Sequence, residues 1–171
     1  ASVVLLQLDS GLVELLRRGS TLDVDSDDTS VAQAIEFPTA GGVTAHAFYY
    51  PPKNRDYAAP AGEKPPLLVM GHGGPTSMAV DAYRAGVQYW TSRGIAVLDV
   101  NYGGSTGFGR AYRNRLRGVW GILAVTDVAA AVRDVTGRGL ADPPRVSITG
   151  GRPGGFTTLG SLVGTDLSAA G

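Results

Sequence analysis

The sequence predicts an α/β fold with a mostly parallel sheet. Three short apolar segments suited to buried strands occur at residues 67–70, 95–100 and 145–148. Segments with the apolar spacing of helices, at residues 80–93 and 122–135, separate them. Strands that alternate with helices form right-handed β-α-β units, and the strands of such units run parallel.

The N-terminal part of the chain has a different character. Val3–Leu8 and Leu12–Arg17 are two β-type runs joined by Asp9-Ser10-Gly11, which is typical of a hairpin. Asp23–Ser30 is polar and acidic, and it contains too few apolar residues to join a core. We therefore expect a hairpin region at residues 1–18, a linker at 19–33 and the main domain at 34–171.

The remaining elements follow from glycine and proline positions. Ala34–Pro38 and Val43–Tyr50 read as a second hairpin, and the loop Pro51–Pro66 holds five prolines. Residues 150–155 predict a sharp turn, and residues 156–163 predict the start of a helix.

Composition excludes several classes of function. The 171 residues are 43% hydrophobic and 18% charged, as in ordinary globular proteins, and 15 basic residues balance 15 acidic ones. This balance gives no indication of nucleic acid or a membrane as a partner. Cysteine is absent, so disulfides and thiolate metal sites are excluded. We expect a cytoplasmic location, no metal and no cofactor.

Glycine-rich blocks after the predicted strands carry a family resemblance. They are His72-Gly73-Gly74-Pro75, the loop from Asn101 to Gly109, and Gly150-Gly151-Arg152-Pro153-Gly154-Gly155, together with Trp120-Gly121 and Gly139–Pro143. Their order and spacing over residues 34–165 resemble the acylaminoacyl-peptidase and dipeptidyl-peptidase branch of the prolyl oligopeptidase family. The resemblance implies an α/β-hydrolase fold that is C-terminally incomplete here. It also implies that the hairpin at 1–18 resembles the last strands of a β-propeller.

Three of these blocks supply the candidate site. Gly73 and Gly74 can bring backbone N–H groups close to an oxyanion, although a plain glycine turn is the alternative. His72 is interpreted as an orienting or packed residue, and His46 as a surface or half-buried histidine in an alternating strand. Tyr102 completes the set around the expected pocket.

The resemblance places a nucleophile elbow at residues 150–155, with Arg152 where the family has its serine. A guanidinium stays protonated and has no lone pair for attack on a carbonyl, and Pro153 has no N–H to donate. Proline also disfavours helical geometry in the residue before it, so we expect Arg152 to be extended and the turn shape to be lost. No catalytic residue is therefore intact. Arg152 is either a plain loop arginine or the anchor of an anion.

Two further motifs invite functional readings. Gly103-Gly104-Ser105-Thr106-Gly107 matches the G-x-S-x-G pattern, but the resembled family has a non-catalytic loop here, and we expect no base within reach of Ser105. Arg110, Arg113, Arg115 and Arg117 are interpreted as a solvated helical face or as a salt-bridge surface of the kind that the resembled family has.

These observations predict a catalytically silent, truncated serine-peptidase-like domain, although the family is one of hydrolases. No histidine follows His72, and Asp166 lies too early for the acid of a triad ordered serine, acid, histidine. One alternative is a segment of an active serine aminopeptidase, acyl-peptide hydrolase or esterase whose remainder is absent. The other is a module that binds a peptide, small molecule or anion. The strand at 145–148 would be an open sheet edge, so we expect self-association or a partner chain there.

Overall fold

A five-stranded sheet organises the computed structural model, which describes residues 2–19, 25–167 and 169–171. Its order is β3-β4-β6-β5-β7, and β6, β5 and β7 are parallel while β3 and β4 add an antiparallel edge. The strands are β3 (Gln33–Thr39), β4 (Val43–Tyr50), β5 (Leu67–Gly71), β6 (Ala96–Asn101) and β7 (Val146–Gly150). The predicted α/β fold is confirmed, and the strands after residue 66 are parallel as predicted. The hairpin makes the whole sheet mixed.

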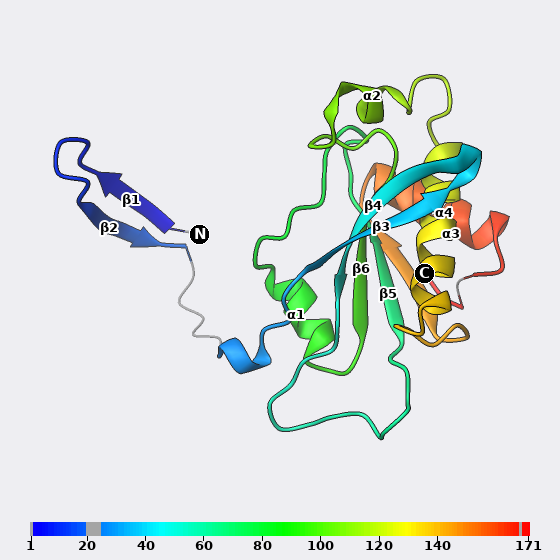
Figure 1. The fold of residues 1–171 in the computed structure, drawn as a ribbon, viewed down its shortest axis with the longest axis horizontal. Helices are drawn as coiled ribbons and strands as arrows, with labels where there is room; N and C mark the ends of the chain where they lie inside the picture. Colours follow the sequence, from blue (N-terminus) through cyan, green and yellow to red (C-terminus); the bar gives the residue numbers. More distant parts are fainter. Residues whose placement is uncertain (1, 20–24, 168) are drawn as a thin grey trace.

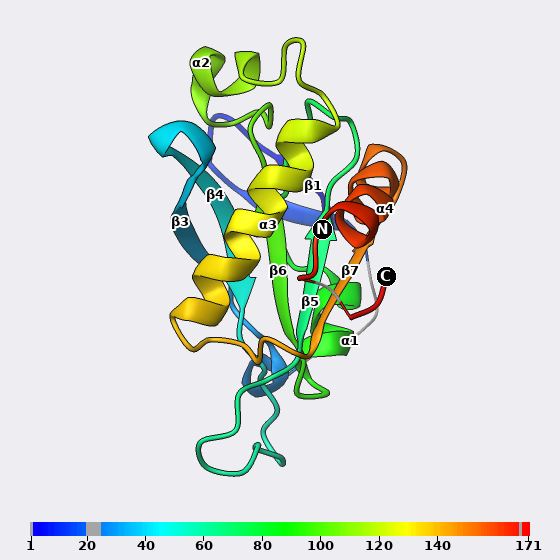
Figure 2. The same ribbon diagram turned by 90° about the vertical axis from the view of Figure 1, so that its right-hand side faces the viewer.

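Helices cover both faces of this sheet (Figure 2). The helical elements are η1 (Ser26–Asp28), η2 (Ala40–Gly42), α1 (Ala85–Thr91), α2 (Gly109–Asn114), α3 (Ile122–Gly137) and α4 (Pro153–Gly164). On one face, Val128, Val132 and Val135 of α3 join the larger core cluster with Val69 and Leu98 of the sheet. On the other face, Val87 of α1 packs in a smaller cluster with strand residues. The sheet is therefore buried on both sides, as parallel sheets require.

Two helices begin at places that differ from the prediction. α1 begins at Ala85 and not at residue 80, because the side chain of Asn101 bonds both the N–H and the C=O of Ala79 and holds that segment out of a helix. α4 begins at Pro153 and not at residue 156. Proline is well suited to the first helical position, where the missing N–H costs nothing.

The N-terminal hairpin stands apart from the sheet in Figure 1. β1 (Ser2–Leu6) and β2 (Val13–Arg18) form their own two-stranded antiparallel sheet. All residues from 2 to 19 are exposed, including nine large apolar side chains. The division at residues 18 and 33 stays a prediction, and residues 20–24 of the expected linker lie outside the described part of the chain.

The outer edge of β7 is not fully open, which corrects the expectation from the sequence. The N–H of Ala169 donates to Val146 O at 2.7 Å, and the N–H of Ile148 donates to Ala170 O at 3.0 Å. The chain's own last residues thus occupy part of the edge. Among the described residues, no helix is long and apolar enough to cross a lipid bilayer.

Candidate functional site

The loops that follow β5 and β7 meet at the carboxyl edge of the sheet. A Cβ placed on Gly73 would lie 3.4 Å from Gly151 O and 3.7 Å from both Arg152 Cβ and Pro153 Cδ. A cavity of about 460 Å³ opens between these loops. It is lined by Gly73, Gly74, Ser77, Gly151 and Arg152, and we call it the elbow pocket. The structure therefore brings together two of the glycine blocks that the sequence singled out.

Arg152 adopts the backbone of a strained turn, so the expectation of an extended conformation was wrong. Its φ is 57° and its ψ is −124°, and it is the one non-glycine residue with positive φ in the described part of the chain. The clash between a proline and the residue before it mainly excludes helical ψ values, and −124° lies outside that range. The turn shape thus persists although the serine does not.

Close packing of glycines fixes this turn. A Cβ on Gly154 would overlap the carbonyl oxygen of Gly71 at the end of β5, and a Cβ on Gly150 would lie 2.5 Å from the carbonyl of Gly154. The first turn of α4 can therefore rest directly on β5 only because neither position carries a side chain. This contact leaves residues 151–153 a short path between strand and helix.

The turn at residues 151–155 carries no hydroxyl group. Arg152 is exposed and offers only N–H donors, and Pro153 offers none from its backbone. The next two amides are used within the turn, since Gly154 N–H donates to Gly151 O at 3.0 Å and Gly155 N–H to Arg152 O at 2.9 Å. Within the described residues, the N–H groups of Gly73 and Gly74 have no backbone partner and remain candidates for binding an oxyanion.

His72 is a packed residue that precedes this pocket's glycines and does not line the pocket, and neither does the buried Tyr102, so the expectation that both surround the pocket was wrong. The ring of His72 stacks on Tyr102 with 4.4 Å between centroids, and the Tyr102 hydroxyl donates to His72 O at 2.9 Å. Nδ1 lies 2.9 Å from Gly73 O, and Nε2 lies 2.7 Å from Ser105 Oγ. Burial lowers the pKa of His72 below its usual 6.5, while the Gly73 carbonyl and the charge of Asp99 act in the opposite direction. His72 is therefore engaged on both ring nitrogens.

Ser105 has a base within reach, which the sequence analysis did not expect. Its hydroxyl lies 2.7 Å from both His72 Nε2 and Tyr102 O. However, Ser105 has no exposed surface. A substrate carbonyl cannot approach its oxygen, so the non-catalytic interpretation of the loop rests on burial.

Two buried polar residues that the sequence analysis missed hold loops in place, Asp127 the loop after β6 and Asn101 the loop after β5. Asp127 of α3 accepts from Thr39 Oγ1 at 2.5 Å and from Gly103 N–H at 2.7 Å. Asn101 binds the backbone of Ala79, as described above. A signal was present for both, because each is a polar residue within an apolar run, and buried polar groups are almost always hydrogen-bonded. Both residues position the loops and do not line the pocket.

The other candidates lie outside the elbow pocket. His46 of β4 is half-buried, stacks on Phe108 at 4.1 Å and lies 3.6 Å from a carboxylate oxygen of Glu36. Asp166 is exposed near the end of the chain. Among the described residues, no three His, Cys, Asp or Glu side chains gather in a way that could hold a metal ion.

Comparison with known proteins agrees with this architecture. Residues 81–170 match the model of the prolyl oligopeptidase family. The chain is 38% identical over 100 residues to dipeptidyl aminopeptidase BIII of Pseudoxanthomonas mexicana, covering 58% of this chain and 14% of that protein. It is 44% identical over 91 residues to the acylamino-acid-releasing enzyme of Mus musculus, covering 53% and 12%.

Solved structures show the same likeness. A puromycin-hydrolyzing peptidase of Mycobacterium tuberculosis superposes with a TM-score of 0.94 at 45% identity, covering 99% of this chain and 26% of that one. The acylaminoacyl peptidase of Pyrococcus horikoshii gives 0.72 at 25% identity, covering 82% and 22%. The chain thus spans about a quarter or less of the relatives it matches. The family match covers more than half of the chain and the fold agrees, so this chain belongs to the prolyl oligopeptidase family.

Proposed function

We propose that this chain is a peptidase-family α/β-hydrolase domain that does not hydrolyse substrates by a serine mechanism. The observation that carries the proposal is Arg152 on the positive-φ turn between β7 and α4. The side chain that points from this turn would have to be the nucleophile, and a guanidinium cannot serve as one. The next residue, Pro153, also removes the oxyanion donor that an elbow normally supplies.

The conclusion does not depend on the supply of a general base. Within this chain, the imidazole of His72 contacts Ser105, which is buried. An arginine at the nucleophile position would silence the site even if a longer chain supplied an acid and a histidine. The alternative of an active serine peptidase therefore requires a different nucleophile.

A reversal experiment tests the proposal. The unmodified chain should neither be labelled by a fluorophosphonate probe nor hydrolyse esters or aminoacyl anilides. Arg152→Ser with Pro153→Ala restores the serine and the N–H but should stay at background on its own. The Nε2 atom of His72 is bound to Ser105, and His46 lies outside the elbow pocket, so neither histidine is placed to take the proton of the restored serine.

A matched pair of fusions gives the positive control. Both the unmodified chain and the double variant are joined to the C-terminal catalytic segment of the puromycin-hydrolyzing relative. We expect labelling and turnover only in the fusion that carries Arg152→Ser and Pro153→Ala. Turnover by the fusion with the native Arg152 would contradict the proposal and require another nucleophile.

A further inference from the structure

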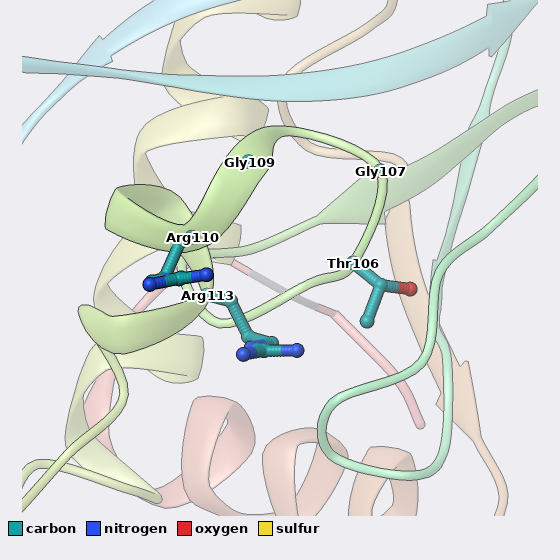
Figure 3. A pocket seen from close by; sticks show the side chains of 5 residues that line it. All are labelled: Thr106, Gly107, Gly109, Arg110 and Arg113. Carbon is teal, nitrogen blue, oxygen red and sulfur yellow. The ribbon is translucent and has the colours of Figure 1, made fainter.

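A second cavity, of about 290 Å³, lies beside the loop after β6 (Figure 3). It is lined by Thr106, Gly107, Gly109, Arg110 and Arg113, and we call it the arginine pocket. Figure 3 shows the side chains of Arg110 and Arg113 extending from α2 toward this space, with Thr106 on the loop across from them. The two arginines stand three positions apart along the helix, so they share one of its faces.

Both arginines have unused donor capacity. The ion pairs among the described residues use Arg55, Arg84, Arg138 and Arg145, and none uses Arg110 or Arg113. The nearby Arg115 is committed elsewhere, since it donates to Thr44 O at 2.6 Å and lies over the ring of Tyr112. Within the basic segment, Arg115 is therefore bound to the rest of the fold, whereas Arg110 and Arg113 line a cavity.

The walls of the arginine pocket are held in place by hydrogen bonds. The buried Tyr112 of α2 donates its hydroxyl to Asn101 O at 2.6 Å, and its carbonyl accepts from Gly104 N–H at 3.1 Å. Gly107 has a φ of 91°, and a Cβ there would lie 2.9 Å from Met78 Cε. The backbone is thus fixed around the space into which two flexible cations reach.

One hydrogen bond joins this pocket to the elbow pocket. The N–H of Thr106, which lines the arginine pocket, donates to the carbonyl of Ser77 at 2.9 Å, and Ser77 lines the elbow pocket. The loops that line the two spaces are therefore joined by this bond. A peptide that spans both spaces would present a carbonyl to Gly73 and Gly74 and a charged group to α2.

We propose that the arginine pocket binds a carboxylate group of a peptide through Arg110 and Arg113. The guanidinium fork matches a planar carboxylate with two parallel N–H···O bonds, and charge-assisted bonds of this kind are the strong ones. The cavity is small, which suits an acidic side chain better than a large ligand. The inference concerns binding alone and holds whether or not the chain hydrolyses anything.

A pair of peptides that differ only in charge tests this site on the full 171-residue chain. Acetyl-Gly-Gly-Glu amide and acetyl-Gly-Gly-Gln amide are titrated into the protein and their dissociation constants are measured by calorimetry. The glutamate peptide should bind at least about tenfold more tightly, since hydrogen bonds to charged groups are worth about that factor or more. Equal affinity for the two peptides would overturn the proposal.

Matched arginine variants locate the effect. Arg110→Gln with Arg113→Gln should weaken binding of the glutamate peptide by about tenfold or more and leave the glutamine peptide unchanged. Arg117→Gln removes an exposed arginine of the same segment, and Arg152→Gln removes the arginine of the elbow pocket; neither should reproduce the loss. The assignment is wrong if Arg117→Gln weakens binding equally, or if only Arg152→Gln does. It is also wrong if the site binds inorganic phosphate and shows no preference between the peptides.

A measurement on the unmodified protein removes any dependence on how the variants fold. Phenylglyoxal modifies exposed arginines, and peptide mapping by mass spectrometry reports each site. The glutamate peptide should slow modification of Arg110 and Arg113 at least severalfold while Arg117 reacts as before. Modification of Arg110 and Arg113 at unchanged rates would overturn the proposal.

Discussion

Arg152 keeps an uncommon backbone conformation that its own side chain does not favour. Positive φ at a non-glycine residue costs about 1–3 kcal/mol, which the surroundings must offset. Here they do so through the contact of Gly154 with Gly71, which fixes where α4 starts. The conformation of the turn is therefore a property of the packing around it, while the chemistry is a property of residue 152.

The burial of His72 should make the stability of the protein depend on pH. Because burial lowers its pKa, the folded protein binds a proton at this site less readily than the unfolded chain does. The unfolded chain thus takes up more protons just below pH 6.5, and the free energy of unfolding should fall as the pH drops through that value, levelling off below the folded pKa. A ring-proton NMR titration, with His46→Gln to assign the two histidines, should give His72 a pKa below 6.5. A value above 6.5 would contradict the burial argument.

The sequence predicted what these residues can do chemically, but it did not predict which distant residues they contact in the fold. The loss of a nucleophile and of an N–H donor follows from the identities of Arg152 and Pro153 alone. The φ of Arg152 does not, because Gly71 lies more than eighty residues earlier in the chain. The contact of His72 with Ser105, 33 residues apart, was missed for the same reason.

At the scale of elements, the first turn of α4 packs directly on the end of β5, with no room for a side chain on Gly154. The predicted position of α4 was late by three residues, since an apolar helical pattern begins only at Phe156 whereas proline and two glycines fill the first turn. Those glycines read as a loop in the sequence and act as a packing surface in the fold. The strands were predicted more closely, because continuous apolar runs mark buried strands directly.

Alanine substitutions at two glycines of α4 distinguish the effect of packing from the effect of helix propensity. Gly154→Ala should lower the free energy of unfolding by about 1–3 kcal/mol, since the added methyl group overlaps Gly71 O and overpacking costs that much. Gly164→Ala lies in the same helix with no atom near its Cβ, and it should be neutral or stabilising by up to about 1 kcal/mol. Urea denaturation measures both. Similar values for the two variants would show that α4 does not rest on β5 in this way.

At the scale of the whole molecule, the exposed apolar side chains of the described residues include two groups that matter for association. One is the β1–β2 hairpin, and the other is the outer face of α4, where Phe156, Leu159 and Val163 are 50%, 66% and 91% exposed. Trp120 stacks on Phe156 at 5.2 Å and widens the second patch. Contiguous apolar surface of this kind is typical of contact sites.

The chain is therefore expected to self-associate. Since Ala169 and Ala170 already pair with part of β7, the face of α4 is the stronger candidate for the contact than the sheet edge. Light scattering should show a mass that rises with protein concentration, and Leu159→Glu with Val163→Glu should return it toward the monomer. The matched change Val31→Glu, at an exposed residue elsewhere, should not. A monodisperse monomer of the unmodified chain would contradict the expectation.

The carboxylate of Asp127 ties two distant parts of the chain, and this has a consequence for motion. One oxygen binds Thr39 at the hairpin turn of the antiparallel edge, and the other binds the Gly103 amide in the loop beside the candidate site. An opening of the β3–β4 edge that draws Thr39 away would leave the carboxylate half-satisfied in a buried place, so the two ends should open together. The rate at which the Gly103 amide hydrogen exchanges with solvent should then depend on how often the β3–β4 edge opens, although Gly103 lies outside that edge.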